Sequence, residues 1–410
     1  MAKVFHSLIT SIDIGTTKIS VLIAQKLSDD QIVILGIGKA PSYGLDKGVV
    51  VDIEKTVESI KQAVKEAELM AGCLVTSAYI GISGSHIQSF NTHGAVPIKR
   101  SQVQPADIKA VLETAQAISI EEGQKILHAL PQYFRIDGKD RIANPLGLHG
   151  VRLDAAVHII TGSVASMQNL IACCELAGIT IKDIVLEQLA SAAGVLNSDE
   201  LALGVGMLDI GGGTSDFAIY QDGTIRYTKV VPIAGNYFTK DLAIGLQTTV
   251  QEAERIKREY GDVSMAFESQ DKEFEIAAVY GNAVYNINKQ KIDYILHARA
   301  FELFKILQKD IQDSSLSSMM TTGLVLTGGG SLLKGIDKLA SSILSLSVRR
   351  GEPRTSSLSF DSLQNPIYAT GYGLLKYALQ KNRQAHFENL EGPIAKRIFA
   401  KMKTWVENFF

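Results

Sequence analysis

Asp209-Ile210-Gly211-Gly212-Gly213-Thr214-Ser215-Asp216 lies between two apolar runs, and Asp13-Ile14-Gly15-Thr16-Thr17-Lys18 repeats its opening 196 residues earlier. Apolar runs on either side of a short polar stretch predict a strand, a tight turn and a returning strand. The expected strands are residues 8–12 and 19–24 around the first turn, and 203–208 and 217–220 around the second. Two such units predict a duplicated fold of two equivalent halves, although a short tripeptide such as Asp-Ile-Gly also recurs by chance.

The rest of the chain alternates β-branched strands with helical stretches, which predicts an α/β fold. Apolar residues at helical spacing predict helices at residues 52–70, 104–118, 249–260 and 288–311. Residues 85–158 are mixed in character, as expected of an inserted subdomain. Residues 380–392 are polar and weakly patterned, which is typical of a linker.

Composition excludes several classes of protein. The 410 residues are enough for two or more domains, and 46% apolar residues exclude a disordered chain. No apolar run approaches the ~20 residues that span a bilayer. A formal net charge of −2 argues against a nucleic-acid partner. Three cysteines are too few for a disulfide framework, which favours a reducing, cytoplasmic compartment.

The glycine-rich turns suggest phosphate binding. The chain has neither P-loop spacing nor a G-x-G-x-x-G motif, but a third such turn is present, Thr327-Gly328-Gly329-Gly330-Ser331. Glycines let consecutive backbone N–H groups approach phosphate oxygens, and hydroxyl groups and a lysine add donors. The predicted phosphate-binding residues are Gly15, Thr16, Thr17, Lys18, Gly211, Gly212, Gly213, Thr214, Gly328, Gly329, Gly330 and Ser331.

Two aspartates at equivalent positions predict a metal site. Asp13 and Asp209 are expected to hold a hydrated Mg²⁺ between them, since Mg²⁺ prefers carboxylates and water. The third turn is expected to lead into a helix near Leu332, whose N-terminus would face the ligand. Taken singly, each turn is better explained as a hairpin whose aspartate caps its own backbone; the three turns together favour nucleotide binding.

These turns resemble the two phosphate hairpins of the actin/Hsp70/sugar-kinase superfamily, and residues 324–335 resemble its adenosine motif. Its connecting helices resemble Glu187-Gln188-Leu189-Ala190-Ser191-Ala192-Ala193 and Tyr368-Ala369-Thr370-Gly371-Tyr372-Gly373. The resemblance implies a duplicated actin-like (ribonuclease-H-like) fold with two halves around a nucleotide cleft, and ATP and Mg²⁺ as ligands.

The same resemblance implies roles for further residues. Glu187, or Gln188 in its place, would orient the attacking water, and hydrolysis, if present, would be slow. Glu254 and Lys257 match a Glu-x-x-Lys pair that clamps the purine in some relatives. The alternative for that pair is a solvated i,i+3 ion pair worth a few tenths of a kcal/mol.

Within the superfamily, the chain is similar nearly end to end to the FtsA family of bacterial cell-division actin homologues. The similarity includes Val231-Pro232-Ile233-Ala234-Gly235-Asn236-Tyr237-Phe238-Thr239, which adds Gly235 and Asn236 to the implied nucleotide site. It also includes Asn144-Pro145-Leu146-Gly147 in the insert. The implied division is 1–84 with 163–195 and 366–379 (subdomain 1A), 85–162 (1C), 196–230 with 300–365 (2A), 231–299 (2B), a linker 380–392 and a terminal helix 393–410.

The last residues predict an amphipathic helix. On a helical wheel one arc of about 160° is apolar, the other side is basic, and the local charge is +3. This pattern is typical of a helix lying in a membrane interface that carries anionic lipid; the alternatives are a helix docked on the protein's own body or on a partner. The apolar residues are Ile394, Ile398, Phe399, Met402, Trp405, Val406, Phe409 and Phe410, and the basic ones Lys396, Arg397, Lys401 and Lys403.

The family resemblance implies a function and partners. The protein would form head-to-tail polymers with itself, bind the C-terminal tail of FtsZ and anchor the FtsZ ring to the cytoplasmic face of the cell membrane, with later division proteins as further partners. The FtsZ tail would dock near the helix beginning around Asn288, where Lys291 and Arg299 are candidate contacts or, alternatively, a solvated basic face. The rival functions are another membrane-linked actin-like scaffold, for cell shape or pilus assembly, and an Hsp70-type or sugar-kinase-type enzyme.

Overall fold

The computed structural model describes residues 8–28, 31–264, 273–277, 284–313, 316–355 and 360–390. Its first elements are β1 (Leu8–Ile14), β2 (Lys18–Lys26), β3 (Ile32–Pro41), β4 (Leu45–Asp46), β5 (Val49–Val50), α1 (Ile53–Ala71), β6 (Ser77–Ile82), β7 (Gln88–Pro97), α2 (Pro105–Gln116), β8 (Gln124–Ile136), β9 (Arg152–Ser163), α3 (Val164–Leu176) and β10 (Thr180–Leu186). The others are α4 (Glu187–Val195), α5 (Ser198–Leu203), β11 (Val205–Ile210), β12 (Ser215–Gln221), β13 (Thr224–Val231), α6 (Gly235–Gly245), α7 (Val250–Tyr260), β14 (Glu273–Ala277), β15 (Val284–Asn288), α8 (Lys289–Asp313), β16 (Leu324–Thr327), α9 (Ile336–Leu344), β17 (Val348–Arg350) and α10 (Ala369–Leu390).

Two five-stranded sheets repeat one topology, which confirms the predicted duplication. The strand orders are β3-β2-β1-β6-β10 and β13-β12-β11-β16-β17. In each sheet the first three strands pair antiparallel, the fourth pairs in parallel with the central strand, and the fifth pairs in parallel with the fourth. The registers also correspond, because Asp13 lies opposite Ser20 and Asp209 opposite Asp216. Each hairpin therefore brings a polar pair to the same edge of its sheet.

The strand predicted over residues 203–208 begins later than expected. Leu203 ends α5, and Gly204 then turns the chain with a φ of 115°, so that β11 starts at Val205. The capping box of Asn197 and Glu200 explains the short helix, because each side chain accepts a hydrogen bond from the other residue's backbone N–H.

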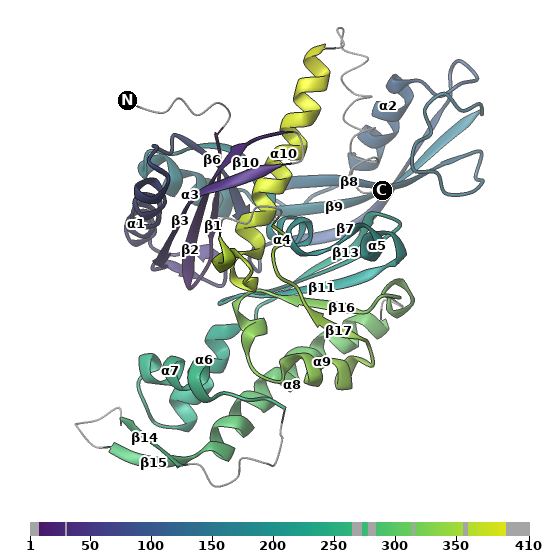
Figure 1. Cartoon of the computed structure of the whole chain (residues 1–410). Coiled ribbons are helices and arrows are strands. Elements are labelled where there is room, and N and C mark those ends of the chain that lie inside the picture. The colour runs from purple at the N-terminus through teal and green to yellow at the C-terminus, as the bar shows by residue number, and fades with distance from the viewer. Residues whose placement is uncertain are drawn as a thin grey trace.

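Each of the two connecting helices follows one half of the molecule in the sequence but packs against the sheet of the other half. α4 follows β10 of the first sheet but packs against the second sheet, where Val195 meets Met207 and Tyr220. α10 follows the second half but packs on the first sheet, where Leu375 contacts the cluster around Leu22. Figure 1 shows α10 running past α4 between the two sheets. This exchange fixes the cleft between the halves.

The helices cross at Gly373, where a Cβ atom would lie 1.7 Å from the carbonyl oxygen of Ala190. We expect Gly373→Ala to force the helices apart and to lower the free energy of unfolding by about 1–3 kcal/mol, the usual cost of overpacking. Gly371→Ala is the matched control, since its Cβ would lie 3.4 Å from Leu22 Cδ1, an ordinary contact. Urea unfolding of both variants measures the difference; equal stabilities would contradict the close crossing.

The predicted linker is largely helical. α10 continues to Leu390, so residues 380–390 extend the connecting helix instead of forming a linker. The stretch holds no proline or glycine before Gly392, and its residues are mostly fair helix formers, which lets the helix continue by local propensity. Residues 391–410, with the whole predicted amphipathic helix, lie outside the described residues. None of the helices within the described ranges is long and apolar enough to cross a membrane.

The insert forms its own layer. β7, β9 and β8 make a three-stranded antiparallel sheet, with α2 packed on one face around Val111 and Phe134. Figure 1 places it at the end of the molecule away from α6, α7, β14 and β15. The sheet meets β13 of the second half through Ser89, whose hydroxyl donates to the Thr228 carbonyl at 2.8 Å.

His158 is buried at this junction, where its ring nitrogens contact Asn91 Oδ1 at 2.7 Å and Thr228 Oγ1 at 3.0 Å. Burial lowers the pKa of His158 to about 4. Folding therefore favours the neutral ring: its contribution is complete above pH 6.5 and is lost as the pH falls towards 4. Between pH 7 and pH 5, the free energy of unfolding of the wild type should fall by about 2 kcal/mol more than that of His158→Gln. Unfolding curves at both pH values test this, and parallel losses would contradict it.

Candidate nucleotide site

A cavity of about 1020 Å³ is lined by residues from both halves. All the residues predicted from the turns line it except Ser331, and so do Gly235, Asn236, Glu254, Lys257 and Glu187. Ser331 is instead buried below the third turn, where its hydroxyl donates to the Gly328 carbonyl at 2.7 Å. The structure thus brings together residues that are more than 300 positions apart in the sequence.

The third turn differs from its prediction. It continues as a short 3-10 helix over Gly329–Leu332, and α9 begins only at Ile336. Gly335, with a φ of 80°, redirects the chain between them. The helix expected near Leu332 therefore begins four residues later than predicted, and the turn contributes its own glycine backbone to the cavity wall.

The two hairpins face each other across the cavity. Each is closed by the same bond, from Gly15 N–H to the Lys18 carbonyl at 3.1 Å and from Gly211 N–H to the Thr214 carbonyl at 2.9 Å. Their tips touch, because a Cβ on Gly213 would lie 2.3 Å from Thr16 Oγ1. Only glycine fits at this approach, which leaves backbone N–H groups of both tips at the cavity wall.

Asp13 is held by a cation and a hydroxyl. Lys18 Nζ lies 2.8 Å from Asp13 Oδ2, and Ser20 Oγ donates to the same oxygen at 3.3 Å. Lys18 therefore balances the charge of Asp13 here. If a phosphate group were bound, Lys18 would have to interact with both the phosphate and Asp13.

Asp209 is buried between the connecting helices. Ser191 Oγ and Thr370 Oγ1, from α4 and α10, donate to Asp209 Oδ2 at 2.6 Å and 3.2 Å. Burial raises the pKa of Asp209, and the charge of Asp13 raises it further. The carboxylate thus pays a desolvation cost in the folded protein that its two hydroxyl partners only partly offset.

Asp216 was not assigned a role from the sequence, although it closes the quoted turn. It accepts hydrogen bonds from Ser83 Oγ, Gln188 Nε2 and Thr214 Oγ1, the last two at 2.9 Å and 3.0 Å. Burial raises the pKa of Asp216 to about 7. The strand register could have identified Asp216 from the sequence. Asp216 lies opposite Asp209 in the second hairpin, as Ser20 lies opposite Asp13 in the first.

The structure separates Glu187 from Gln188. Glu187, the first residue of α4, lines the cavity, whereas Gln188 is fully buried and donates to Asp216. Burial, followed by the charges of Asp13, Asp216 and Asp209, raises the pKa of Glu187 well above its usual value. Of the two candidates, only Glu187 is placed to meet a water molecule in the cavity.

The residues fit a magnesium nucleotide. Four acidic side chains, Asp13, Asp209, Asp216 and Glu187, line the polar end of the cavity together with Lys18. A triphosphate could enter this negative field only with a neutralising cation. In the described part of the chain, no group of three or more His, Cys, Asp or Glu side chains could by itself hold a metal.

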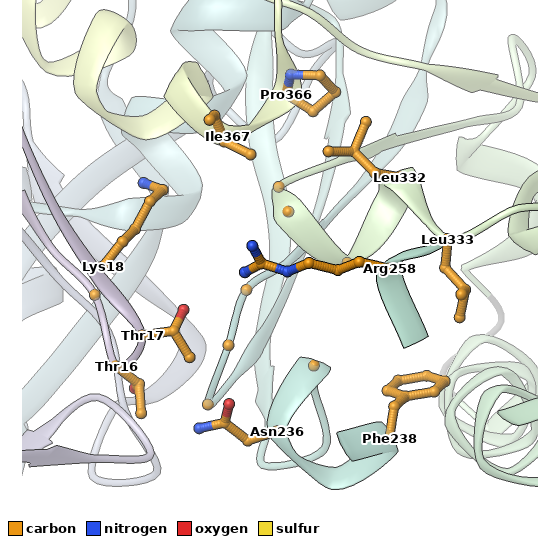
Figure 2. A pocket seen from close by; sticks show the side chains of 18 of the residues that line it. Thr16, Thr17, Lys18, Asn236, Phe238, Arg258, Leu332, Leu333, Pro366 and Ile367 are labelled. Carbon is orange, nitrogen blue, oxygen red and sulfur yellow. The ribbon is translucent and has the colours of Figure 1, made fainter. Parts of the chain in front are cut away.

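Several apolar side chains line the opposite end of the cavity. Figure 2 shows Phe238, Leu332, Leu333 and Ile367 around it, facing the polar hairpin of Thr16, Thr17 and Lys18. These residues were missed because they come from three separate segments with no common pattern. A polar end beside an apolar end matches a nucleotide, whose phosphates are charged and whose base is flat and weakly polar.

Glu254 and Lys257, predicted as a purine clamp, belong to a larger network of polar contacts. Lys257 Nζ lies 2.6 Å from Glu254 Oε2 and donates to the Gly235 carbonyl at 3.1 Å. Burial lowers the pKa of Lys257, so the pair is not a solvated surface contact. Sequence reasoning missed Arg258, which also lines the cavity and whose guanidinium points into it from α7 (Figure 2).

The two candidate contacts for the FtsZ tail differ in their surroundings. Lys291 is exposed at the start of α8. Arg299 instead forms an ion pair with Asp241 at 2.5 Å, and its guanidinium lies 5.3 Å from the centre of the Tyr237 ring. Lys291 is therefore the more available of the two, and docking of the tail stays a prediction.

Two family models match the chain: "Cell division protein FtsA" over residues 207–373 and "SHS2 domain inserted in FTSA" over residues 84–161. A cell division protein FtsA from Pseudomonas aeruginosa is 42% identical, with 98% of each chain covered. That of Neisseria meningitidis serogroup B is 41% identical with the same coverage. That of Escherichia coli K12 is 35% identical over 98% of this chain and 96% of its own.

Solved structures resemble the fold at lower identity. The PilM–PilN type IV pilus biogenesis complex has a TM-score of 0.66 at 16% identity, covering 90% of this chain and 98% of the other. MreB5 of Spiroplasma citri bound to ADP has a TM-score of 0.57 at 15% identity, covering 92% and 98%. Likeness at this level concerns the fold alone, and it confirms the expected actin-like architecture.

Proposed function

This chain belongs to the FtsA family of cell division proteins, and on that premise we propose that it is an ATP-binding, actin-like protein that polymerises and anchors the FtsZ ring to the cytoplasmic face of the cell membrane. The observation that carries the ATP-binding part is the pair of facing hairpins. The glycine tip of the second hairpin touches Thr16 and Thr17 of the first, and the two aspartates lie in one cavity beside Glu187. This arrangement supports binding of a nucleotide with its metal, gripped from both halves.

Each part of the cavity has a proposed role. The backbone N–H groups of the hairpins and the third turn bind phosphate oxygens, and Lys18 adds charge. Asp13 and Asp209 hold Mg²⁺ through water, and the ion supplies neutralisation of phosphate charge. Glu187 orients the attacking water, while Glu254, Lys257 and Arg258 lie beside the nucleoside.

Slow hydrolysis follows from the placement of Glu187. In-line attack needs a positioned water, and small displacements of the orienting group change the rate strongly. Burial, followed by the charges of the surrounding carboxylates, raises the pKa of Glu187, which favours its protonated form. We therefore propose an ATPase that turns over slowly and acts mainly as a nucleotide-dependent assembly switch.

Membrane attachment rests on the sequence of residues 394–410. A single amphipathic helix binds lipid reversibly, whereas many helices on one polymer bind far more tightly through their high effective concentration. Head-to-tail assembly would therefore convert a weak anchor into a firm one. An FtsZ tail docked near Lys291 would place the ring beside the membrane.

The proposal is tested with the full chain, ATP, Mg²⁺ and lipid monolayers of anionic or purely zwitterionic composition. We expect filaments by electron microscopy on the anionic monolayer, and saturable binding of a synthetic FtsZ tail peptide by fluorescence anisotropy. Lys291→Glu should weaken peptide binding, whereas Lys309→Glu, an exposed lysine farther along α8, should not. Loss of both filaments and peptide binding would reject the proposal.

Other outcomes of this experiment would favour one of the rival functions. Filaments without peptide binding would favour another membrane-linked actin-like scaffold. Phosphoryl transfer from ATP to a small molecule would favour a kinase. Both outcomes would contradict the anchoring of FtsZ while leaving the nucleotide cavity as proposed.

A further inference from the structure

A second cavity, of about 360 Å³, lies where the insert meets the second half of the molecule. The insert contributes Tyr133 from β8 and Arg141 from the segment that follows, and the second half contributes Thr224 and Arg226 from β13. It shares no lining residue with the nucleotide cavity. Its size is at the lower end of small-molecule sites.

Three guanidinium groups gather around the ring of Tyr133. The Cζ atoms of Arg141, Arg135 and Arg226 lie 4.7 Å, 5.2 Å and 5.7 Å from its centre. The one acidic side chain lining the cavity is Asp222, which pairs with Arg226 at 2.6 Å. The cavity lining therefore carries one more positive than negative side chain, with Arg135 close by, in a protein whose net charge is −2.

Arg226 supplies an independent sign of a ligand. Its side chain is only 6% exposed, and Nε has no hydrogen-bond partner within the described structure. Burying a guanidinium N–H without an acceptor is costly, and such groups are normally satisfied. An anion entering the cavity would supply the missing acceptor.

Arg141 lines the same cavity, and its backbone segment is held in place. Its neighbour Ile142 exchanges two backbone hydrogen bonds with Phe134 of β8, at 2.7 Å and 2.8 Å. This short bridge fixes the segment against the strand that carries Tyr133. The site is thus formed by ordered backbone on both sides, one from each half of the molecule.

We propose that this cavity binds a small oxyanion, a phosphate group or a phosphate ester, between Arg141 of the insert and Arg226 of the second half. Guanidinium groups bind such anions through paired N–H donors, and Phe134, Ile142 and Tyr133 offer an apolar wall for an organic substituent. The bound anion neutralises Arg141, accepts a hydrogen bond from Arg226 Nε, and so links the insert to β13. It thereby stabilises one orientation of the insert.

The test is isothermal titration of the full chain with inorganic phosphate and, separately, with phenyl phosphate. A saturating, non-hydrolysable ATP analogue fills the first cavity during both titrations. We expect saturable binding that Arg141→Gln weakens about tenfold or more, the loss of one charge-assisted interaction. Lys139→Gln is the matched control: it removes one positive charge from an exposed residue two positions earlier that does not line the cavity. It should bind within about twofold of the wild type.

The two probes separate the possible sources of the anion. Tighter binding of phenyl phosphate would identify an organic phosphate ester as the ligand, and equal binding would identify free phosphate. Absence of binding by both probes, or equal binding by the wild type and Arg141→Gln, would overturn the proposal. Binding lost in Lys18→Gln but kept in Arg141→Gln would also overturn it, since the anion would then occupy the hairpins.

Discussion

Replacing Asp209 by Asn is expected to weaken Mg²⁺-dependent ATP binding by about 10–100-fold while leaving the protein at least as stable as before. The affinity falls because Asp209 acts on the ion through water, and loss of such an outer partner has effects of that size. The stability is kept because burial already disfavours the Asp209 carboxylate and raises its pKa. The amide oxygen of Asn can still accept from Ser191 and Thr370.

Two measurements distinguish an effect of Asp209→Asn on nucleotide binding from an effect on stability. Isothermal titration with ATP, with and without Mg²⁺, gives the affinity, and urea unfolding without nucleotide gives the stability. Asp140→Asn, which changes an exposed acid outside the cavity, serves as the control for charge. Unchanged affinity would remove Asp209 from the metal site. Lower stability with unchanged affinity would support the alternative in which the aspartate merely caps its own hairpin.

The duplicated fold was predictable because its signal is local. An apolar run, an aspartate, a glycine turn and a second apolar run define each hairpin, and these patterns depend on neighbouring residues alone. The repeat at Asp13 and Asp209 then implied equal halves, and both sheets have the same order. The register that pairs Asp209 with Asp216 was equally readable once the hairpin was drawn.

The parts that could not be predicted depend on distant contacts. Ile367, in the short 3-10 helix Pro366–Tyr368 before α10, and Phe238, in α6, line the cavity because packing places these segments there, which no local pattern records. The linker was misjudged for the opposite reason. The polar residues 380–390 looked unstructured because they lack an apolar face, yet a helix already formed at Ala369 extends through them without a nucleation cost.

Replacing Trp405 by Glu is expected to release the protein from anionic vesicles. In the predicted helix, Trp405 lies in the apolar arc, so a carboxylate there would have to enter the interface or tilt the helix out of it. Because assembly multiplies each weak attachment, the loss should be largest under polymerising conditions. Co-sedimentation with vesicles, with ATP and Mg²⁺ present, measures it.

Asn408→Glu is the matched control for this change. It adds the same negative charge to the same helix but on the predicted polar side, so it should reduce binding only by the weaker attraction to anionic lipid, about 1 kcal/mol per charge. A membrane helix therefore predicts a large difference between two variants of equal net charge. Equal losses would mean that charge alone governs attachment. A lower melting temperature for Trp405→Glu without vesicles would instead show that the segment packs on the protein's own body.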